Sequence, residues 1–149
     1  MSIASALLPN ITKAFTNNRY KDFKDKLFAL LILSVVIGII CLCLILIFPS
    51  QILKLIYKID IGINYIYLIG PFFIFIYMQP CLSVAVQAMN MTSKLLYVTI
   101  TSIILKFLTL TITTSLGFGI NSLIYSLIIG ILTTTFVTSF IVLKKIARL

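Results

Sequence analysis

One lysine, Lys106, interrupts an otherwise uncharged apolar stretch of this 149-residue chain. An ammonium group in such a stretch is costly unless it meets water or an anion, so its position indicates a hydrated cavity. The alternatives are snorkelling of its long stem toward the lipid headgroups and a structural partner outside this chain. Of these readings we favour the hydrated cavity.

Two rows of polar side chains recur at helical spacing, and Lys106 belongs to one of them. Each row occupies one face of a helix, and within lipid such a face must turn toward protein or water. For the hydroxyl groups we favour hydrogen bonds between helices. The whole set forms our candidates for a substrate cavity: Gln79, Ser83, Gln87 and Asn90 in one row, and Thr99, Ser102, Lys106, Thr109 and Thr113 in the other.

Acid–base and metal chemistry lack their usual residues in this chain. It contains no histidine, and its three acidic residues are all aspartates. The cysteines form no CxxC pair and are interpreted as small apolar packing residues. We therefore predict that the protein is not an enzyme and has no cofactor and no metal site. The cysteines are Cys41, Cys43 and Cys81.

The composition of the chain indicates which secondary-structure elements carry these residues. Hydrophobic residues make up 61% of the chain and charged residues 10%, whereas soluble domains are nearer half apolar and a quarter charged. Stretches of about 20 apolar residues can cross the bilayer as helices. We predict an all-α membrane protein with transmembrane helices at residues 27–48, 63–89, 95–115 and 118–143, a partial helix at 1–15 and a short interfacial helix near 50–58.

The net charge of +9 reflects topology rather than a nucleic-acid partner, because the cations flank the apolar runs and form no groove with stacking aromatics. Residues 16–26 form a basic loop, whereas residues 115–120 carry no charge. Cytoplasmic loops are enriched in Lys and Arg. We therefore expect a multi-pass protein with residues 16–26 and both termini in the cytoplasm.

Small residues every four positions mark the last predicted helix. Such a seam lets another helix approach closely. Its members are Ser122, Ser126, Gly130, Thr134 and Thr138.

The second predicted helix contains Gly70, Pro71 and Pro80. Each proline removes a backbone hydrogen bond, so we expect kinks, which serve either packing or a hinge beside a transport site.

Two segments resemble a known family. "ALLPNITKAFTNNRYKDFKDKL" is similar to the "ALxPxIS" segment of bacterial polysaccharide flippases of the stage V sporulation protein B type. "GPFFIFIYMQPCLSVAVQAMNMTSKLLY" is similar to their later "LQGLGK" helix, with Gln87 at the glutamine and Lys94 near the lysine. The sequence departs from that pattern at residues 88–90, where the family favours glycines. These flippases belong to the multidrug/oligosaccharidyl-lipid/polysaccharide exporter superfamily.

The resemblance implies that residues 1–149 form a single transmembrane region corresponding to helices eight to twelve of a two-lobe flippase in the bacterial cytoplasmic membrane, with residues 1–15 as the tail of helix eight. The partners would be the bilayer, a lipid-linked sugar substrate, and a missing N-terminal lobe or another subunit. This piece alone would be inactive. The alternatives are a multidrug/cation antiporter of the same superfamily, a free-standing small four-helix transporter and a structural membrane protein.

Overall fold

The fold is entirely helical in the part of the chain that the structure, a computed structural model, describes: residues 3–17, 19–57 and 63–147. Helices α2, α6, α7 and the continuous run from α4 to α5 are long and apolar enough to cross a membrane, which confirms the predicted four-span all-α class. The elements are α1 (Ile3–Thr16), α2 (Tyr20–Ile47), α3 (Pro49–Tyr57), α4 (Ile63–Ile69), the 3₁₀ turn η1 (Gly70–Phe72), α5 (Phe73–Ala88), α6 (Thr92–Ser115) and α7 (Asn121–Ile146).

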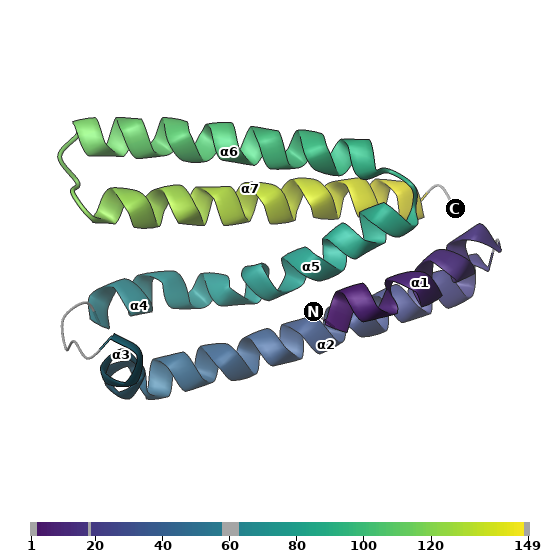
Figure 1. Cartoon of the computed structure of the whole chain (residues 1–149), viewed down its shortest axis with the longest axis horizontal. Helices are drawn as coiled ribbons and strands as arrows, with labels where there is room; N and C mark the ends of the chain where they lie inside the picture. The colour runs from purple at the N-terminus through teal and green to yellow at the C-terminus, as the bar shows by residue number, and fades with distance from the viewer. Residues whose placement is uncertain (1–2, 18, 58–62, 148–149) are drawn as a thin grey trace.

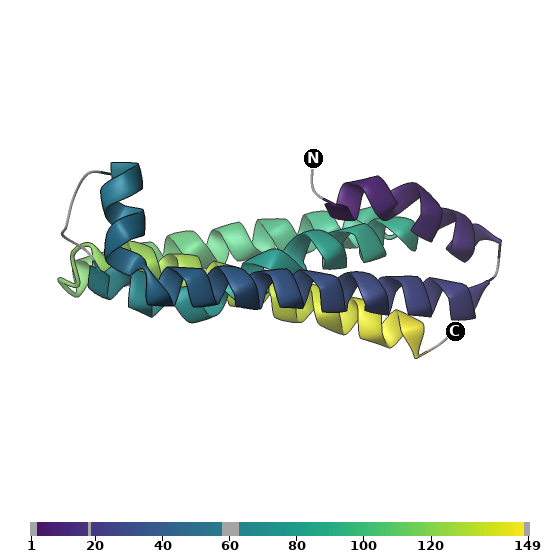
Figure 2. The ribbon, with the colours of Figure 1, turned by 90° about the horizontal axis from the view of Figure 1, so that it is seen from below.

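The long helices form an open row rather than a closed bundle. Figure 1 shows α6, α7, α5 and α2 side by side in that order, and the edge-on view of Figure 2 shows how shallow the row is. The contacts agree, since α6 packs on α7, α7 on α5, and α5 on α2. Both faces of such a row remain available to lipid or to another part of a protein.

Helix α1 covers part of one face and creates the hydrophobic core. It lies against α2 and α5 (Figure 1) and buries Ile11 and Ala14 there. Phe23 of α2 is completely buried, and its ring meets Phe15 edge-on at 5.2 Å between centroids. Cys81 is also buried in this core, whereas Cys43 is exposed, so packing explains only some of the cysteines.

The predicted loop at residues 16–26 is wrong over most of its length, because α2 already begins at Tyr20. Phe23, Leu27 and Leu30 are all buried. Their spacing of four and three residues continues one apolar face of a helix, while Lys21 and Lys26 are exposed. The charged residues therefore lie outside the apolar span, but they still belong to the helix.

Helix α5 packs closely on α2 at a glycine of α2, and a short 3₁₀ turn precedes α5. A Cβ on Gly38 would lie only 3.2 Å from Cα of Ile74, so the glycine permits close approach of the two backbones. Gly70 and Pro71 lie in the 3₁₀ turn between α4 and α5, whereas Pro80 lies inside α5. In Figure 1, α5 changes direction along its length and rises toward the start of α6, as expected for a helix with an internal proline.

The two tight turns end their helices in the same way. After α5, Asn90 adopts a left-handed conformation (φ 56°), and the Met91 N–H donates to the Val86 carbonyl at 3.1 Å. After α6, Gly117 does the same (φ 81°), and the Phe118 N–H donates to the Thr113 carbonyl at 3.2 Å. These are Schellman motifs, which satisfy the last carbonyls of a helix.

Most of the cations lie at one end of the row, which we name the basic end. The C-terminal ends of α1, α5 and α7 and the N-terminal ends of α2 and α6 meet there (Figure 1). At the opposite end, α3 contacts α2 and α4 and projects out of the plane of the row (Figures 1 and 2). It carries Lys54 in its last turn. The described cations of the basic end are Lys13, Arg19, Lys21, Lys24, Lys26, Lys94, Lys144 and Lys145.

Candidate functional site

A groove with both polar and apolar lining residues lies where α5, α6 and α7 face one another. Its volume is about 480 Å³. The predicted candidates Gln79, Ser83 and Thr99 line it together, and α7 adds Thr134 and Thr138 from its seam of small residues. The remaining lining residues are apolar: Ile76, Pro80, Leu82 and Leu95. We name this cavity the α5–α7 groove.

Gln79 ties the wall of the groove to α7. Its side-chain amide donates to the Ile131 carbonyl at 3.3 Å and lies 3.5 Å from the Thr135 hydroxyl. A glutamine side chain can donate through its amide nitrogen and still accept a hydrogen bond through its amide oxygen. Gln79 therefore joins two helices while it also faces the groove.

A second interhelical contact of the predicted polar residues lies between α6 and α7 and is formed by hydroxyl groups. The Ser102 hydroxyl donates to the Gly130 carbonyl at 3.0 Å, and the Thr134 hydroxyl lies 2.9 Å from the Ser102 oxygen. Thr134 also reaches the Gly130 carbonyl at 2.8 Å. The network adjoins the groove, because Thr134 belongs to both.

Lys106 lies one turn beyond this network and packs across α7. A Cβ on Gly130 would overlap Cε of Lys106 and would lie 2.6 Å from its Cγ and 2.7 Å from its Cδ. The stem of the lysine therefore occupies the notch that the missing glycine side chain leaves. Lys106 is half-buried and does not itself line the α5–α7 groove. Seven residues separate it from Thr99 on α6, a rise of about 10 Å along the helix.

The other hydroxyls do not behave as expected. We favoured interhelical hydrogen bonds, but Ser83, Thr99 and Thr109 donate to the carbonyls of Pro80, Leu95 and Leu105 in their own helices. Thr113 likewise donates to Thr109. A hydroxyl always finds a carbonyl three or four residues back, whereas a carbonyl of another helix is in reach only where the backbones are very close.

Gln87 and Asn90 lie away from the groove. Both are exposed, and neither lines it. The left-handed conformation of Asn90 ends α5, so the helical spacing that placed it in the row stops before this residue. Sequence reasoning also missed Thr134 and Thr138 as lining residues, because their four-residue spacing indicated only helix packing.

The α7 seam lies against α6. Ser122, Ser126, Gly130 and Thr138 are buried, and α6 and α7 pack along their whole lengths in Figure 1. Ser126 donates to Leu123 of its own helix at 2.8 Å. The buried Ser122 hydroxyl has no hydrogen-bond partner in the described part of the chain.

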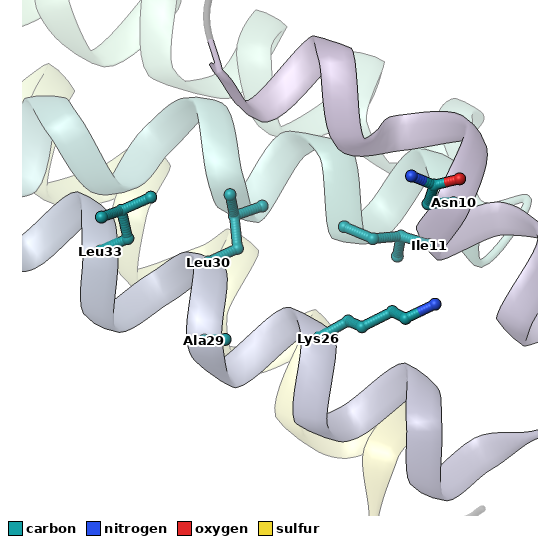
Figure 3. Close-up of a pocket in the computed structure, with 6 residues that line it drawn as sticks. All are labelled: Asn10, Ile11, Lys26, Ala29, Leu30 and Leu33. Carbon is teal, nitrogen blue, oxygen red and sulfur yellow. The ribbon is translucent and has the colours of Figure 1, made fainter.

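A second hollow, of about 290 Å³, lies between α1 and α2. Figure 3 shows the Lys26 side chain extending along it toward the side of Asn10 and Ile11, with Ala29, Leu30 and Leu33 forming the α2 wall. None of the predicted cavity residues lines this hollow. Two of its six lining residues are polar, whereas five of the nine residues that line the α5–α7 groove are polar, so that groove is the better candidate for a polar ligand.

Comparison with known proteins gives one match. The family model described as MatE matches residues 1–112, which is most of the 149-residue chain and extends from α1 into α6. No match was found among curated proteins or among solved structures.

Proposed function

Since the chain belongs to the MatE family of membrane transporters, we propose that it forms part of an exporter that moves a lipid-linked oligosaccharide or polysaccharide precursor across the bacterial cytoplasmic membrane. The mechanism would be alternating access, in which two lobes rock around a binding site near the middle of the bilayer. The α5–α7 groove and Lys106 would form one wall of that site. The basic end would face the cytoplasm, following the distribution of Lys and Arg.

The observation that carries this proposal is the chemistry of the groove and of its charged neighbour. Hydroxyl and amide groups from Gln79, Ser83, Thr99, Thr134 and Thr138 line the groove, and such groups suit the hydroxyls of a sugar. Lys106, a short distance along α6, supplies a cation. A phosphate group links sugar to lipid in this class of substrate, and an ammonium at mid-membrane depth attracts it strongly because screening there is weak.

The open row of helices leaves the face with the groove uncovered, which is consistent with a second lobe or subunit packing there. A helix surrounded by its own protein would be mostly buried, but only 11% of the most apolar window of α6 is buried, and 28% of that of α7. The hydroxyls and the amide nitrogen that line the groove already donate within the protein. Lipid tails would still leave their remaining acceptor positions and the Gln79 oxygen without a partner. A second lobe or another subunit would enclose the groove and complete the path.

A multidrug/cation antiporter is the main rival within the family. A cationic substrate needs acidic groups in its path, yet the acidic residues of this chain are Asp22, Asp25 and Asp60. Asp22 lies in the first turn of α2 at the basic end, and Asp25 follows three residues later. Neither lines the α5–α7 groove, so the groove favours an anionic, sugar-containing substrate.

Substitution of Lys106 in the encoding organism tests the proposal. Loss of one charge-assisted contact weakens binding by about tenfold or more, so Lys106→Leu should reduce export of surface polysaccharide and cause its lipid-linked precursor to accumulate in the cytoplasmic leaflet. Lys106→Arg should keep part of the activity, and Lys106→Glu should be worse than Leu because it repels phosphate. Lys21→Leu, at an exposed position of the basic end, is the matched control.

The measurements are precursor accumulation and surface polysaccharide at equal membrane abundance of each variant. Full activity of Lys106→Leu would remove Lys106 from the substrate path. Unchanged polysaccharide together with lost efflux of a cationic dye would favour the antiporter. Transport of a labelled lipid-linked sugar by the purified chain alone in vesicles would favour the small free-standing transporter instead.

A further inference from the structure

The basic end of the α6–α7 hairpin contains a hollow lined by three lysines. Lys94, Lys144 and Lys145 line it together with Met91, Phe140 and Ile141, and its volume is about 260 Å³. No acidic side chain is among these lining residues. The three ammonium groups come from the first turn of α6 and the last turn of α7, so the hairpin fold itself gathers them.

Two features distinguish this cluster from scattered surface charges. The N-terminus of α6 adds a partial positive charge beside Lys94, which strengthens the attraction for an anion. The Lys144 ammonium also makes a cation–π contact, because its Nζ lies 5.9 Å from the centre of the Phe140 ring. The hollow therefore offers a localised positive potential at the end of two membrane-spanning helices.

An apolar groove continues from the lysine hollow along the hairpin. It has a volume of about 270 Å³ and shares Lys94 and Ile141 with the hollow. The rest of its lining comes from α6 and α7: Tyr97, Val98, Thr101, Thr133 and Val137. From Lys94 to Thr101 it spans seven residues of α6, which is about 10 Å.

This groove is distinct from the α5–α7 groove. The two share no lining residue, and on α6 they use different sides, with Leu95 and Thr99 in one and Val98 and Thr101 in the other. Tyr97 is 72% exposed, so this side of the hairpin is not covered by the described residues and is accessible to a lipid.

We infer that the lysine hollow and its groove together bind an anionic phospholipid of the leaflet at the basic end. The headgroup phosphate would lie among the three ammonium groups, and the first part of an acyl chain would lie in the groove. Basic pockets between helices at the cytoplasmic side are suited to anionic headgroups. A free phosphate ion would use the lysines but would gain nothing from the apolar groove, and the juxtaposition of the two therefore favours a lipid. This inference does not depend on the exported substrate.

Native mass spectrometry of the purified full chain with added dioleoyl phosphatidylglycerol tests the inference. Each lysine near an anionic lipid contributes about fivefold to affinity. Three such losses multiply, so Lys94→Gln/Lys144→Gln/Lys145→Gln should bind this lipid about a hundredfold more weakly. Val137→Trp, which fills the groove without changing charge, should weaken it severalfold. Dioleoyl phosphatidylcholine should bind weakly to every variant.

The matched control removes the same charge from the same end of the row. Lys13, Arg19 and Lys21 are all exposed and do not line the hollow, so their triple replacement by Gln should change affinity less than twofold. An equal loss in this control would overturn the inference in favour of diffuse attraction. Displacement of the lipid by millimolar inorganic phosphate, or full binding by Val137→Trp, would overturn the lipid assignment. Lys94→Gln alone serves if the triple variant loses helicity by circular dichroism.

Discussion

Gly130→Ala probes whether the Lys106 stem crosses α7 as the structure has it. The new Cβ would overlap Cε of Lys106 and stand 2.6 Å from its Cγ, well inside the separation of about 3.5–4.0 Å at which carbon atoms attract. The lysine must therefore leave the notch, and at this depth its ammonium has few favourable places to go. The substitution thus acts through Lys106 rather than through the glycine.

The effect of the clash with Lys106 and the effect of replacing the glycine itself differ in their expected free energies. Overpacking costs about 1–3 kcal/mol, whereas replacing a helical glycine by alanine gains about 1 kcal/mol. In the parent protein, Gly130→Ala should therefore lower the free energy of unfolding by about 0–2 kcal/mol. In the Lys106→Ala background, the same change should stabilise by about 1 kcal/mol. The difference, about 1–3 kcal/mol, is the coupling between the two residues.

Reversible unfolding in detergent micelles by added dodecyl sulfate, followed by circular dichroism, measures this coupling. Gly38→Ala is the control, since its Cβ would lie 3.2 Å from the Ile74 backbone and its cost should be the same with or without Lys106. If Gly130→Ala changed the free energy of unfolding equally in both backgrounds, Lys106 would not lie on Gly130, and the geometry of the candidate site would have to be abandoned.

Three further predictions use the same chain. Gly117→Ala should destabilise by about 1–2 kcal/mol, because φ is 81° and nothing lies within 4 Å of the new Cβ to compensate; an unchanged midpoint of unfolding would contradict the left-handed turn. Ser122→Ala should leave stability unchanged or raise it by up to about 1 kcal/mol, since its buried hydroxyl has no partner among the described residues, whereas a clear loss would reveal a hidden hydrogen bond. Reporter fusions after residues 60 and 149 should lie on opposite sides of the membrane, and fusions on the same side would refute the four-span topology.

The sequence predicted the spans well and their ends poorly, for one physical reason. Bilayer thickness determines how many apolar residues a span needs, so the four runs were recognisable from hydropathy alone. It does not determine where the helix stops in water. Helix α2 begins at Tyr20 because buried Phe23 extends its apolar face, and α7 continues through Lys144 and Lys145 to Ile146.

The sequence predicted which face of a helix the polar residues share, but it did not predict their hydrogen-bond partners. Helical periodicity placed Gln79 and Ser83 together, and both line the groove. It could not show that the Ser102 hydroxyl would reach another helix, since that depends on how closely α7 approaches. Gly130 provides the approach, because its lack of a side chain exposes its carbonyl to Ser102 at 3.0 Å.

Gly130 also links the packing of the α6–α7 hairpin to its proposed chemistry. One glycine accepts the Ser102 hydroxyl at its carbonyl and the Lys106 stem at its Cα, so the cation is positioned by the same contact that holds the helices together. A lysine on a helix with no such notch would be free to snorkel. Because the notch holds the stem against α7, the direction of the charge is coupled to the distance between α6 and α7. A motion that separates the two helices would release Lys106, and a motion that closes them would hold its stem against α7. If Lys106 binds substrate as proposed, the position of the cation would therefore follow the distance between α6 and α7.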